Sequence, residues 1–484
     1  MASIKTNSTY MLISKLSKTV LDVVAVMLLA RALSVQEYGF YKQFLVSQQI
    51  LTAVMSLGIP SSTIFYLSSE RKREYLANVY IALGIISILT ILITPLSAKL
   101  FDLNFKTSFF TTNWLELAII YALSVFVTAS ENMLIALDKL KYMPIYVLLP
   151  SAFWTVGIAF SLIFETNINF VLMIFLIRYL LYFILTVVFA HEKFDFKQLR
   201  RNRMKEILLF GLPVGVSSMI GLFSSNISKL VIGNLYDTET FAIFSNGAYE
   251  IPLLSIIGSS LFSVIIPQLK NHFDMKRLDE VNRLWNKAGL SMIPIIVSLA
   301  SSFIIFSEPI VLFLFSEKYV KSVPYFTLYQ IGLFFRIYSY GSLFIATGKS
   351  KLYMINAAIS MVLNLVLDII LAILIGPIGA IIAGLISTFV LVILQLYQIS
   401  MILNMSILKI YPWKEWMLSI GLSLLISMGF YIAYRFFSTS MYLGLGFAVV
   451  SFGISFLVLS RFVDNQVLEY ALSIVKRKTK ARAK

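Results

Sequence analysis

The sequence is dominated by repeated runs of about 20 or more largely apolar residues, separated by short connections. A run of about 20 residues is the length that a helix needs to cross a hydrocarbon core of about 30 Å. Strand-like alternation of apolar and polar residues is absent, and a helix satisfies its own backbone hydrogen bonds in lipid. The sequence therefore predicts an all-α polytopic membrane protein without a soluble domain.

Composition supports this class and excludes others. Hydrophobic residues make up 59% of the 484 residues and charged residues 13%, whereas soluble chains have about 45–50% and about 25%. The net charge of +16 does not indicate nucleic-acid binding, because the basic residues lie between the apolar runs rather than along one soluble face. The chain has no cysteine, which excludes a disulfide framework and a thiolate metal site. We expect neither a metal nor a cofactor.

We predict about fourteen transmembrane helices. They fall near residues 9–32, 39–67, 75–97, 114–137, 143–164, 168–190, 206–233, 240–267, 288–307, 323–347, 352–375, 377–403, 413–435 and 440–460.

The Lys and Arg residues between these spans predict the orientation, because cytoplasmic loops retain positive charge. With the N-terminus inside, the inner segments include residues 70–75, 191–206, 270–287 and 476–484, which are all basic. Both termini are therefore predicted to be cytoplasmic. The first span is not expected to be a cleavable signal, because charged residues interrupt its apolar stretch.

Two short motifs occur twice. "ALDKLKYM" at 136–143 resembles "ATGKSKLYM" at 346–354, and "LSVQEYGFY" at 33–41 resembles "LYDTETFAIF" at 235–244, at an offset of about 202 that pairs Glu37 with Glu239. Parallel repeats of this kind are typical of alternating-access transporters. We predict two pseudo-symmetric six-helix lobes, two further C-terminal helices and a basic tail. The boundaries are 1–200, 201–405, 406–465 and 466–484.

Ionisable residues inside the predicted spans are the candidate functional residues, because they are costly in lipid and mark pathways for substrates or ions. Lys15, Lys18 and Asp22 share one helix face. Arg178 and Arg336 lie mid-way through their spans, the latter with Tyr329 and Tyr340 on its face, and need either a water-filled cavity or an acid partner. The predicted substrate-binding residues are Lys15, Lys18, Lys42, Arg178, Lys229 and Arg336. The predicted ion-coupling or charge-pairing residues are Asp22, Glu131, Glu250 and Asp368.

Simpler structural roles stay open for some of these residues. Lys42 and Lys229 could extend to the outer interface and Lys15 to the inner one, and Glu131 could pair with a neighbouring loop lysine. A wet cavity lined mostly by cations would nevertheless favour an anionic substrate. Arg suits phosphate oxygens, because its planar fork donates two hydrogen bonds.

Three segments carry a family resemblance: "LLARALSVQEYGFYKQ" (28–43), "LLFGLPVGVSSM" (208–219) and "SKLVIGNLYDTETFAIFSNGAYEIP" (228–252). With the duplicated hairpins, the chain resembles the polysaccharide-transport branch of the multidrug/oligosaccharidyl-lipid/polysaccharide exporter superfamily, and within it the O-antigen-type lipid-linked oligosaccharide flippases. One departure is Ser228-Lys229, where many relatives have an acid beside a basic residue. A coupling role for that acid cannot be carried over.

The resemblance implies a flippase, not an enzyme, that moves an undecaprenyl-diphosphate-linked oligosaccharide to the outer leaflet of a bacterial cytoplasmic (inner) membrane by alternating access. The implied partners are that lipid-linked oligosaccharide, membrane lipids, and a glycan polymerase and glycosyltransferases. The protein would act as a monomer.

Three alternatives are open. A drug antiporter of the same superfamily is opposed by the surplus of intramembrane Lys and Arg. The sequence distinguishes a peptidoglycan lipid-precursor flippase only weakly from a lipid-linked oligosaccharide flippase. A membrane glycan polymerase or glycosyltransferase would carry a large outer loop, but the longest predicted one, 98–113, has a single acid, Asp102.

Overall fold

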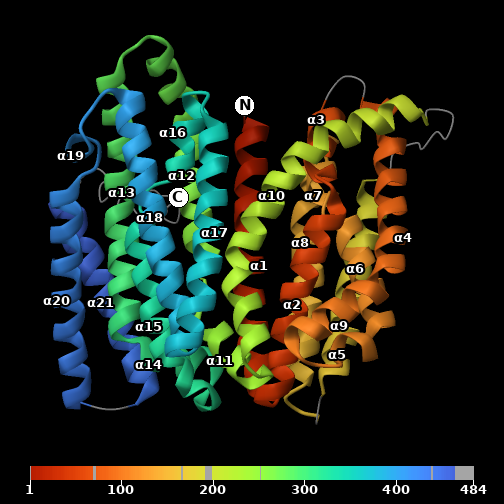
Figure 1. Cartoon of the computed structure of the whole chain (residues 1–484), viewed down its shortest axis with the longest axis horizontal. Helices are drawn as coiled ribbons and strands as arrows, with labels where there is room; N and C mark the ends of the chain where they lie inside the picture. Colours follow the sequence, from red (N-terminus) through yellow and green to blue (C-terminus); the bar gives the residue numbers. More distant parts are fainter. Residues whose placement is uncertain are drawn as a thin grey trace, which may run out of the picture. The chain divides into compact units, whose positions relative to one another are not determined.

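The computed structural model describes residues 2–68, 72–164, 167–190, 199–250, 252–437 and 440–463. These residues form helices joined by short turns, with no strand among them (Figure 1). They divide into two compact units, Met1–Ser245 and Asn246–Lys484, and the boundary falls inside α11. The predicted domain boundaries stay predictions, and the basic tail at 466–484 lies outside the described residues.

The first unit consists of long helices linked by short helical turns. Its elements are α1 (Ala2–Ala32), α2 (Val35–Ser56), α3 (Ile59–Leu67), α4 (Lys72–Phe105), α5 (Phe109–Thr112), α6 (Trp114–Val127), α7 (Ser130–Ala136), η1 (Leu140–Tyr142), α8 (Met143–Phe160), α9 (Ile168–Phe189), α10 (Arg201–Leu235) and most of α11 (Thr238–Gly247). Within it α1 packs against α8, α4 against α6, and α10 against α2, α3 and α4.

The second unit has the same character. Its elements are α12 (Pro252–Asp274), α13 (Leu278–Ile305), α14 (Ser307–Phe315), η3 (Glu317–Ser322), α15 (Val323–Ile331), η4 (Gly332–Phe335), α16 (Tyr340–Ala346), α17 (Ser350–Ile375), α18 (Ile378–Leu403), α19 (Ile407–Ile410), α20 (Trp413–Phe437) and α21 (Met441–Val463). The last two helices pack on α13 through small residues, and the Ser451 hydroxyl donates to that of Ser427 at 2.9 Å. Small side chains let membrane helices approach closely.

The predicted class, an all-α multi-pass membrane protein, is confirmed, but the count of fourteen spans is not. Among the described residues, ten helices are long and apolar enough to cross a membrane, and eleven if α2 and α3 count as one span bent by 50°. Three predicted spans fall outside this set. The span at 9–32 carries too many charges along α1, 240–267 is divided between α11 and α12, and 323–347 is broken into α15, η4 and α16.

The duplicated hairpin has the same backbone geometry in both copies. Asp138 and Gly348 adopt left-handed conformations, with φ of 58° and 71°. The next residue closes the helix end in each copy, since the Lys139 amide donates to the Leu134 carbonyl and the Lys349 amide to the Phe344 carbonyl, both at 2.8 Å. This six-to-one bond is the Schellman helix ending. The repeat is therefore structural and not a chance likeness of two basic loops.

The second repeated motif is also a shared local structure, but its register differs from the prediction. Ser34 caps α2 by accepting from the Glu37 amide, and Asp237 lies at the start of α11, where its carboxylate accepts from the Thr240 amide at 2.7 Å. Aligning these two caps gives an offset of 203 rather than 202. The pairing of Glu37 with Glu239 was wrong, because the structurally equivalent residues of the two motifs are the capping residues, Ser34 and Asp237, and not the acids that follow them.

We expect Ser34→Ala to destabilise the protein by about 1 kcal/mol, because it removes the oxygen that caps α2. Ser34→Asn should retain wild-type stability, since Asn caps as well as Ser. Thermal unfolding of purified protein in detergent measures both. Equal melting temperatures for the two variants would show that the cap contributes nothing.

The break between α2 and α3 lies at Leu57 and Gly58, whose φ angles of 47° and 73° are left-handed. It faces two glycines of α10. A Cβ atom on Gly58 would lie 2.0 Å from the carbonyl oxygen of Gly211, and one on Gly215 would lie 2.7 Å from the Gly58 nitrogen. Backbone therefore crosses backbone here, and only glycine allows this approach. The crossing places α10 beside the break in the α2–α3 span.

Candidate functional site

Two ion pairs in the first unit join α1 to its neighbours. The Lys15 ammonium lies 2.8 Å from a Glu131 carboxylate oxygen on α7, and an Asp22 oxygen lies 2.7 Å from the Arg178 guanidinium on α9. Lys15 and Asp22 are seven residues apart, which puts them on one helix face. The sequence predicted Lys15 and Arg178 as substrate-binding residues, and Asp22 and Glu131 as ion-coupling or charge-pairing residues. The structure brings them together as two ion pairs.

Arg178 is the most buried of these charges, with a side chain that is 11% exposed. Its guanidinium also donates to the Ser151 hydroxyl at 3.4 Å and lies over the rings of Trp154 and Tyr182, at 5.6 and 5.9 Å from their centroids. Contact with aromatic faces stabilises a desolvated cation. Arg178 is thus held by an acid, a hydroxyl and two rings, and is not an unopposed cation.

Lys18 lies on α1 between Lys15 and Asp22 and is half-buried. No carboxylate of the described part of the chain lies within 4.0 Å of its ammonium group. The cluster therefore contains three cations, on Lys15, Lys18 and Arg178, against the two carboxylates of Asp22 and Glu131. One positive charge is in excess, and it belongs to Lys18.

Lys42 and Lys229, also in the first unit, are brought near each other. Lys42 is 8% exposed, and its ammonium lies 5.0 Å from the ring centroid of Tyr38, while its positive charge interacts with that of Lys229. A lysine that is buried to this degree does not extend its ammonium group to the membrane interface, as a snorkelling lysine would. These two lysines form a second basic site on α2 and α10.

In the second unit, Arg336 lies at the break between η4 and α16 rather than inside a helix. Its guanidinium is 2.7 Å from a Glu250 oxygen, and the two side chains are 46% and 42% exposed. Tyr329 interacts with Arg336 as predicted, but Tyr340 instead packs against Trp285, with ring centroids 6.0 Å apart. The expectation that Tyr340 shares a face with Arg336 was wrong, because the span is not one continuous helix.

Asp368 is fully buried on α17, and the Asn364 amide donates to its carboxylate at 3.1 Å. The same helix face carries Asn356, which exchanges two hydrogen bonds with Gln398 of α18 at 2.6 and 3.0 Å. Polar side chains that bond across helices are typical of membrane packing. A carboxylate at this depth is also a candidate ion or proton site.

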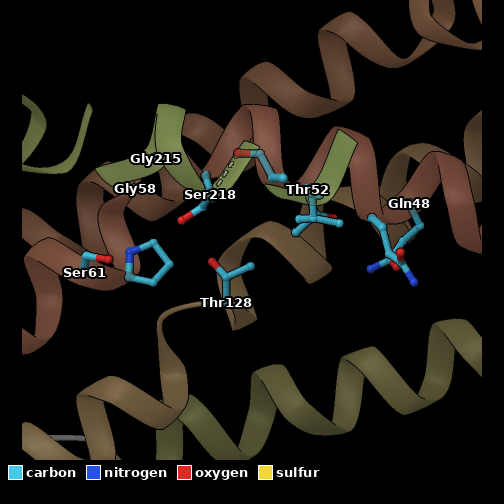
Figure 2. Close-up of a pocket in the computed structure, with 12 residues that line it drawn as sticks. Gln48, Thr52, Gly58, Ser61, Thr128, Gly215 and Ser218 are labelled. Atoms are coloured by element: carbon cyan, nitrogen blue, oxygen red, sulfur yellow. Dashed lines mark hydrogen bonds between the residues drawn. The ribbon is translucent and has the colours of Figure 1, made fainter. Parts of the chain in front are cut away.

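A pocket that the sequence did not predict lies at the break between α2 and α3. It has a volume of about 300 Å³ and is lined by Gln48, Gln49, Thr52, Ala53, Ser56, Gly58, Pro60, Ser61, Thr128, Gly215, Ser218 and Leu222. Figure 2 shows Thr52, Thr128 and Ser218 around the same open space, from three different parts of the unit. Seven of the twelve lining residues have polar side chains, and none of the twelve is charged. The signal in the sequence was Gly58 and Pro60 inside a long apolar run.

One hydrogen bond and one electrostatic contact relate the pocket to the charged cluster. The Gln48 amide, which lines the pocket, donates to the Tyr179 hydroxyl at 3.2 Å. Tyr179 is adjacent in sequence to Arg178 and interacts with both Arg178 and Asp22. The first unit therefore carries an uncharged pocket with polar groups, and Tyr179 lies between this pocket and the charged cluster.

The predicted outer loop at 98–113 is mostly a continuation of α4, which runs to Phe105. Its single acid, Asp102, accepts hydrogen bonds from the amides of Phe110 and Thr111 at 2.9 and 2.8 Å. This carboxylate caps the short helix α5. No group of three or more His, Cys, Asp or Glu residues that could hold a metal ion occurs in the described ranges.

Comparison with known proteins relates this chain to glycan-handling and membrane-transport proteins. Residues 4–273, more than half of the chain, match the family described as polysaccharide biosynthesis protein. The chain is 26% identical over 208 residues to the capsular polysaccharide biosynthesis protein CapF of Staphylococcus aureus. This match covers 41% of the chain and about half, 51%, of the relative.

Solved structures share the fold. The lipid II flippase MurJ in an inward closed conformation is similar with a TM-score of 0.76 and 18% identity, covering 95% of this chain and 99% of MurJ. An inward-facing multidrug resistance MATE family transporter of the MOP superfamily is similar with a TM-score of 0.64 and 15% identity, covering 80% and 94%. At these identities the likeness shows the fold alone.

Proposed function

The chain belongs to the polysaccharide biosynthesis protein family, and we propose that it is a flippase that moves an undecaprenyl-diphosphate-linked oligosaccharide from the cytoplasmic to the outer leaflet by alternating access. Its membership of the family and its fold confirm the predicted resemblance to polysaccharide transporters of the MOP superfamily. The family resemblance implies an O-antigen-type glycan as the cargo, and the bacterial inner membrane, with both termini cytoplasmic, is the proposed location.

The surplus positive charge beside a neutral polar pocket is the observation that carries this proposal. An anionic head group would be attracted to Lys18, whose charge is not offset by any carboxylate within 4.0 Å among the residues that the structure describes. Arg178 and Lys15 have carboxylate partners. A diphosphate could replace those partners, because guanidinium and ammonium groups bind phosphate oxygens as well as carboxylate oxygens. Lys42 and Lys229 in the first unit, and Arg336 in the second, are proposed as further substrate contacts.

A drug antiporter with the same fold fits the site less well. A cationic drug needs an acid that is available to neutralise it. In the first unit, Asp22 and Glu131 are each within 2.8 Å of a cation, and the cluster still carries one positive charge in excess. The site would therefore repel a cationic drug.

Deletion of the gene in its host tests transport against enzymatic synthesis. A flippase defect should leave completed lipid-linked repeat units accessible only from the cytosol, because the cargo is made but not moved. Units that accumulate unfinished, or unpolymerised on the outer face, would contradict the proposal and favour a glycosyltransferase or polymerase. The strain complemented with the wild-type gene is the control.

Asp368 is the proposed coupling residue, and Asp368→Asn should slow transport at least tenfold while the amount of protein in the membrane stays unchanged. A neutral amide is not protonated at physiological pH and lacks the negative charge that attracts a cation, but it still fits beside Asn364. The measurement is the transport rate in proteoliposomes with and without an imposed proton or sodium gradient. Ser360→Ala, on the same face of α17, is the matched control. A wild-type rate and gradient response in Asp368→Asn would remove this residue from the mechanism.

A further inference from the structure

The pocket at the α2–α3 break has the properties of a hydrated binding site. Its volume is about 300 Å³, and Gly58, one of the two residues that form the break, lines it. Non-helical backbone at membrane depth is tolerated only where protein buries it or where it lines a water-filled cavity. Gly215 and Ser218 of α10 close the pocket from the other side. The break and the pocket are therefore one feature.

Three of the hydroxyl groups that line the pocket are arranged as acceptors. Ser56, Thr128 and Ser218 donate their protons to backbone carbonyls of their own chain segments, on Ala53, Val125 and Val214, at 3.1, 2.6 and 3.0 Å. A hydroxyl has one proton to donate and two lone pairs to accept with. With their protons engaged, these three groups present oxygen lone pairs to a ligand. A ligand must then supply O–H or N–H donors.

The two glutamines of the lining complete the pattern. The Gln48 amide nitrogen donates to Tyr179, which leaves the Gln48 carbonyl oxygen as a further acceptor. The Gln49 carbonyl oxygen instead accepts from the Asn226 amide at 3.3 Å, which leaves the Gln49 amino group as a donor. The pocket thus offers several acceptors and at least one donor, without any charge.

We propose that this pocket binds an uncharged sugar residue of the cargo through the free hydroxyls of its ring; this inference rests on the proposed function. A sugar hydroxyl donates and accepts at once, which matches a lining of this kind. Phosphate and carboxylate groups can only accept, and they would meet lone pairs without a cation. A prenyl chain has no hydrogen-bond donor and would leave these oxygen lone pairs unused. The diphosphate would be bound separately, by the surplus charge of the cluster.

Photolabelling tests the assignment. The probe is a dodecyl β-glucoside with a diazirine at the first alkyl carbon, applied to the full chain in nanodiscs, with labelled peptides mapped by mass spectrometry. We expect labelling of peptides from α2 and α10. Dodecyl β-glucoside should displace the probe at a concentration at least tenfold lower than dodecyl β-glucuronide, which differs only by its carboxylate.

Two variants and a control report on the pocket itself. Ser218→Leu fills the space and should reduce labelling at least tenfold. Ser217→Leu, at the exposed neighbouring residue that does not line the pocket, should label as wild type. Thr128→Val keeps the side-chain volume, removes one acceptor and should weaken labelling about fivefold. Unchanged labelling in both Ser218→Leu and Thr128→Val, or equal competition by the glucuronide, would overturn the assignment.

The experiments distinguish a failure of the sugar-site proposal from a failure of the flippase proposal. Pocket labelling by the glucoside in a protein that moves no lipid-linked oligosaccharide would support the sugar site and contradict the flippase proposal. Translocation at the wild-type rate in Ser218→Leu, with labelling also unchanged, would contradict the sugar site and leave the flippase proposal standing.

Discussion

Asp22→Asn is expected to destabilise the folded protein by about 3 kcal/mol, because removing one partner of a buried ion pair strands the other charge. Arg178 is only 11% exposed, and Asp22 is the only carboxylate within 4.0 Å of it in the described residues. The value lies at the lower end of the usual range of about 3–5 kcal/mol, since Asp22 itself is 35% exposed. Thermal unfolding in detergent, with export measured in cells, checks this prediction.

The double variant Asp22→Asn, Arg178→Gln is the control for this experiment. It leaves neither charge behind, so the penalty for an uncompensated buried charge is absent. We expect most of the stability to return while export stays low, because Arg178 would no longer be available to the head group. A stable double variant that exports normally would reduce the pair to a packing role. A stable Asp22→Asn single variant would show that Arg178 is hydrated rather than buried.

Lys18→Gln should weaken binding of undecaprenyl diphosphate at least tenfold and bring surface-glycan export close to background. The cluster of α1, α7 and α9 then contains two cations and two carboxylates, and the surplus charge that attracts the head group is lost. Lys18→Arg should retain most of the binding, because Arg also donates to phosphate oxygens. Stability should change little, since Lys18 forms no ion pair within the described part of the chain.

Lys99→Gln provides the matched control, because Lys99 is an exposed lysine on another membrane helix, α4. The measurement is the equilibrium binding of undecaprenyl diphosphate to purified protein in nanodiscs at two salt concentrations. Equal affinities of Lys18→Gln and Lys99→Gln would contradict the role of Lys18. Loss of binding in Lys18→Arg as well would indicate a geometric rather than an electrostatic requirement.

The helices were predictable because each apolar run is long and ends in polar or turn-forming residues. Most predicted spans agree with a helix within a few residues, as at 168–190 for α9 (Ile168–Phe189) and 377–403 for α18 (Ile378–Leu403). The predicted number of transmembrane spans was not confirmed where a span is interrupted, as around Arg336. Breaks of this kind depend on tertiary packing and leave only weak traces, such as isolated Gly and Pro residues.

The site was only partly predictable. The sequence identified the charged residues, because ionisable groups in lipid are conspicuous, and the shared face of Lys15, Lys18 and Asp22 followed from helical periodicity. The partners did not follow, since Asp22 and Arg178 are 156 residues apart and no local pattern connects them. The pocket was missed because Ser, Thr and Gln residues are unremarkable one at a time. Their convergence depends on the crossing of Gly58 with Gly211 and Gly215.

The most direct test of the account is translocation by the purified protein. Proteoliposomes would carry an undecaprenyl-diphosphate-linked oligosaccharide with a fluorescent sugar, and a membrane-impermeant glycosidase would report which leaflet holds it. We predict that wild-type protein exposes inner-leaflet cargo to the enzyme, and that Lys18→Gln protein matches protein-free liposomes. Failure of the wild-type protein to move the cargo, or equal rates for wild type and Lys18→Gln, would contradict the claim that a surplus positive charge in the membrane receives an anionic lipid-linked glycan.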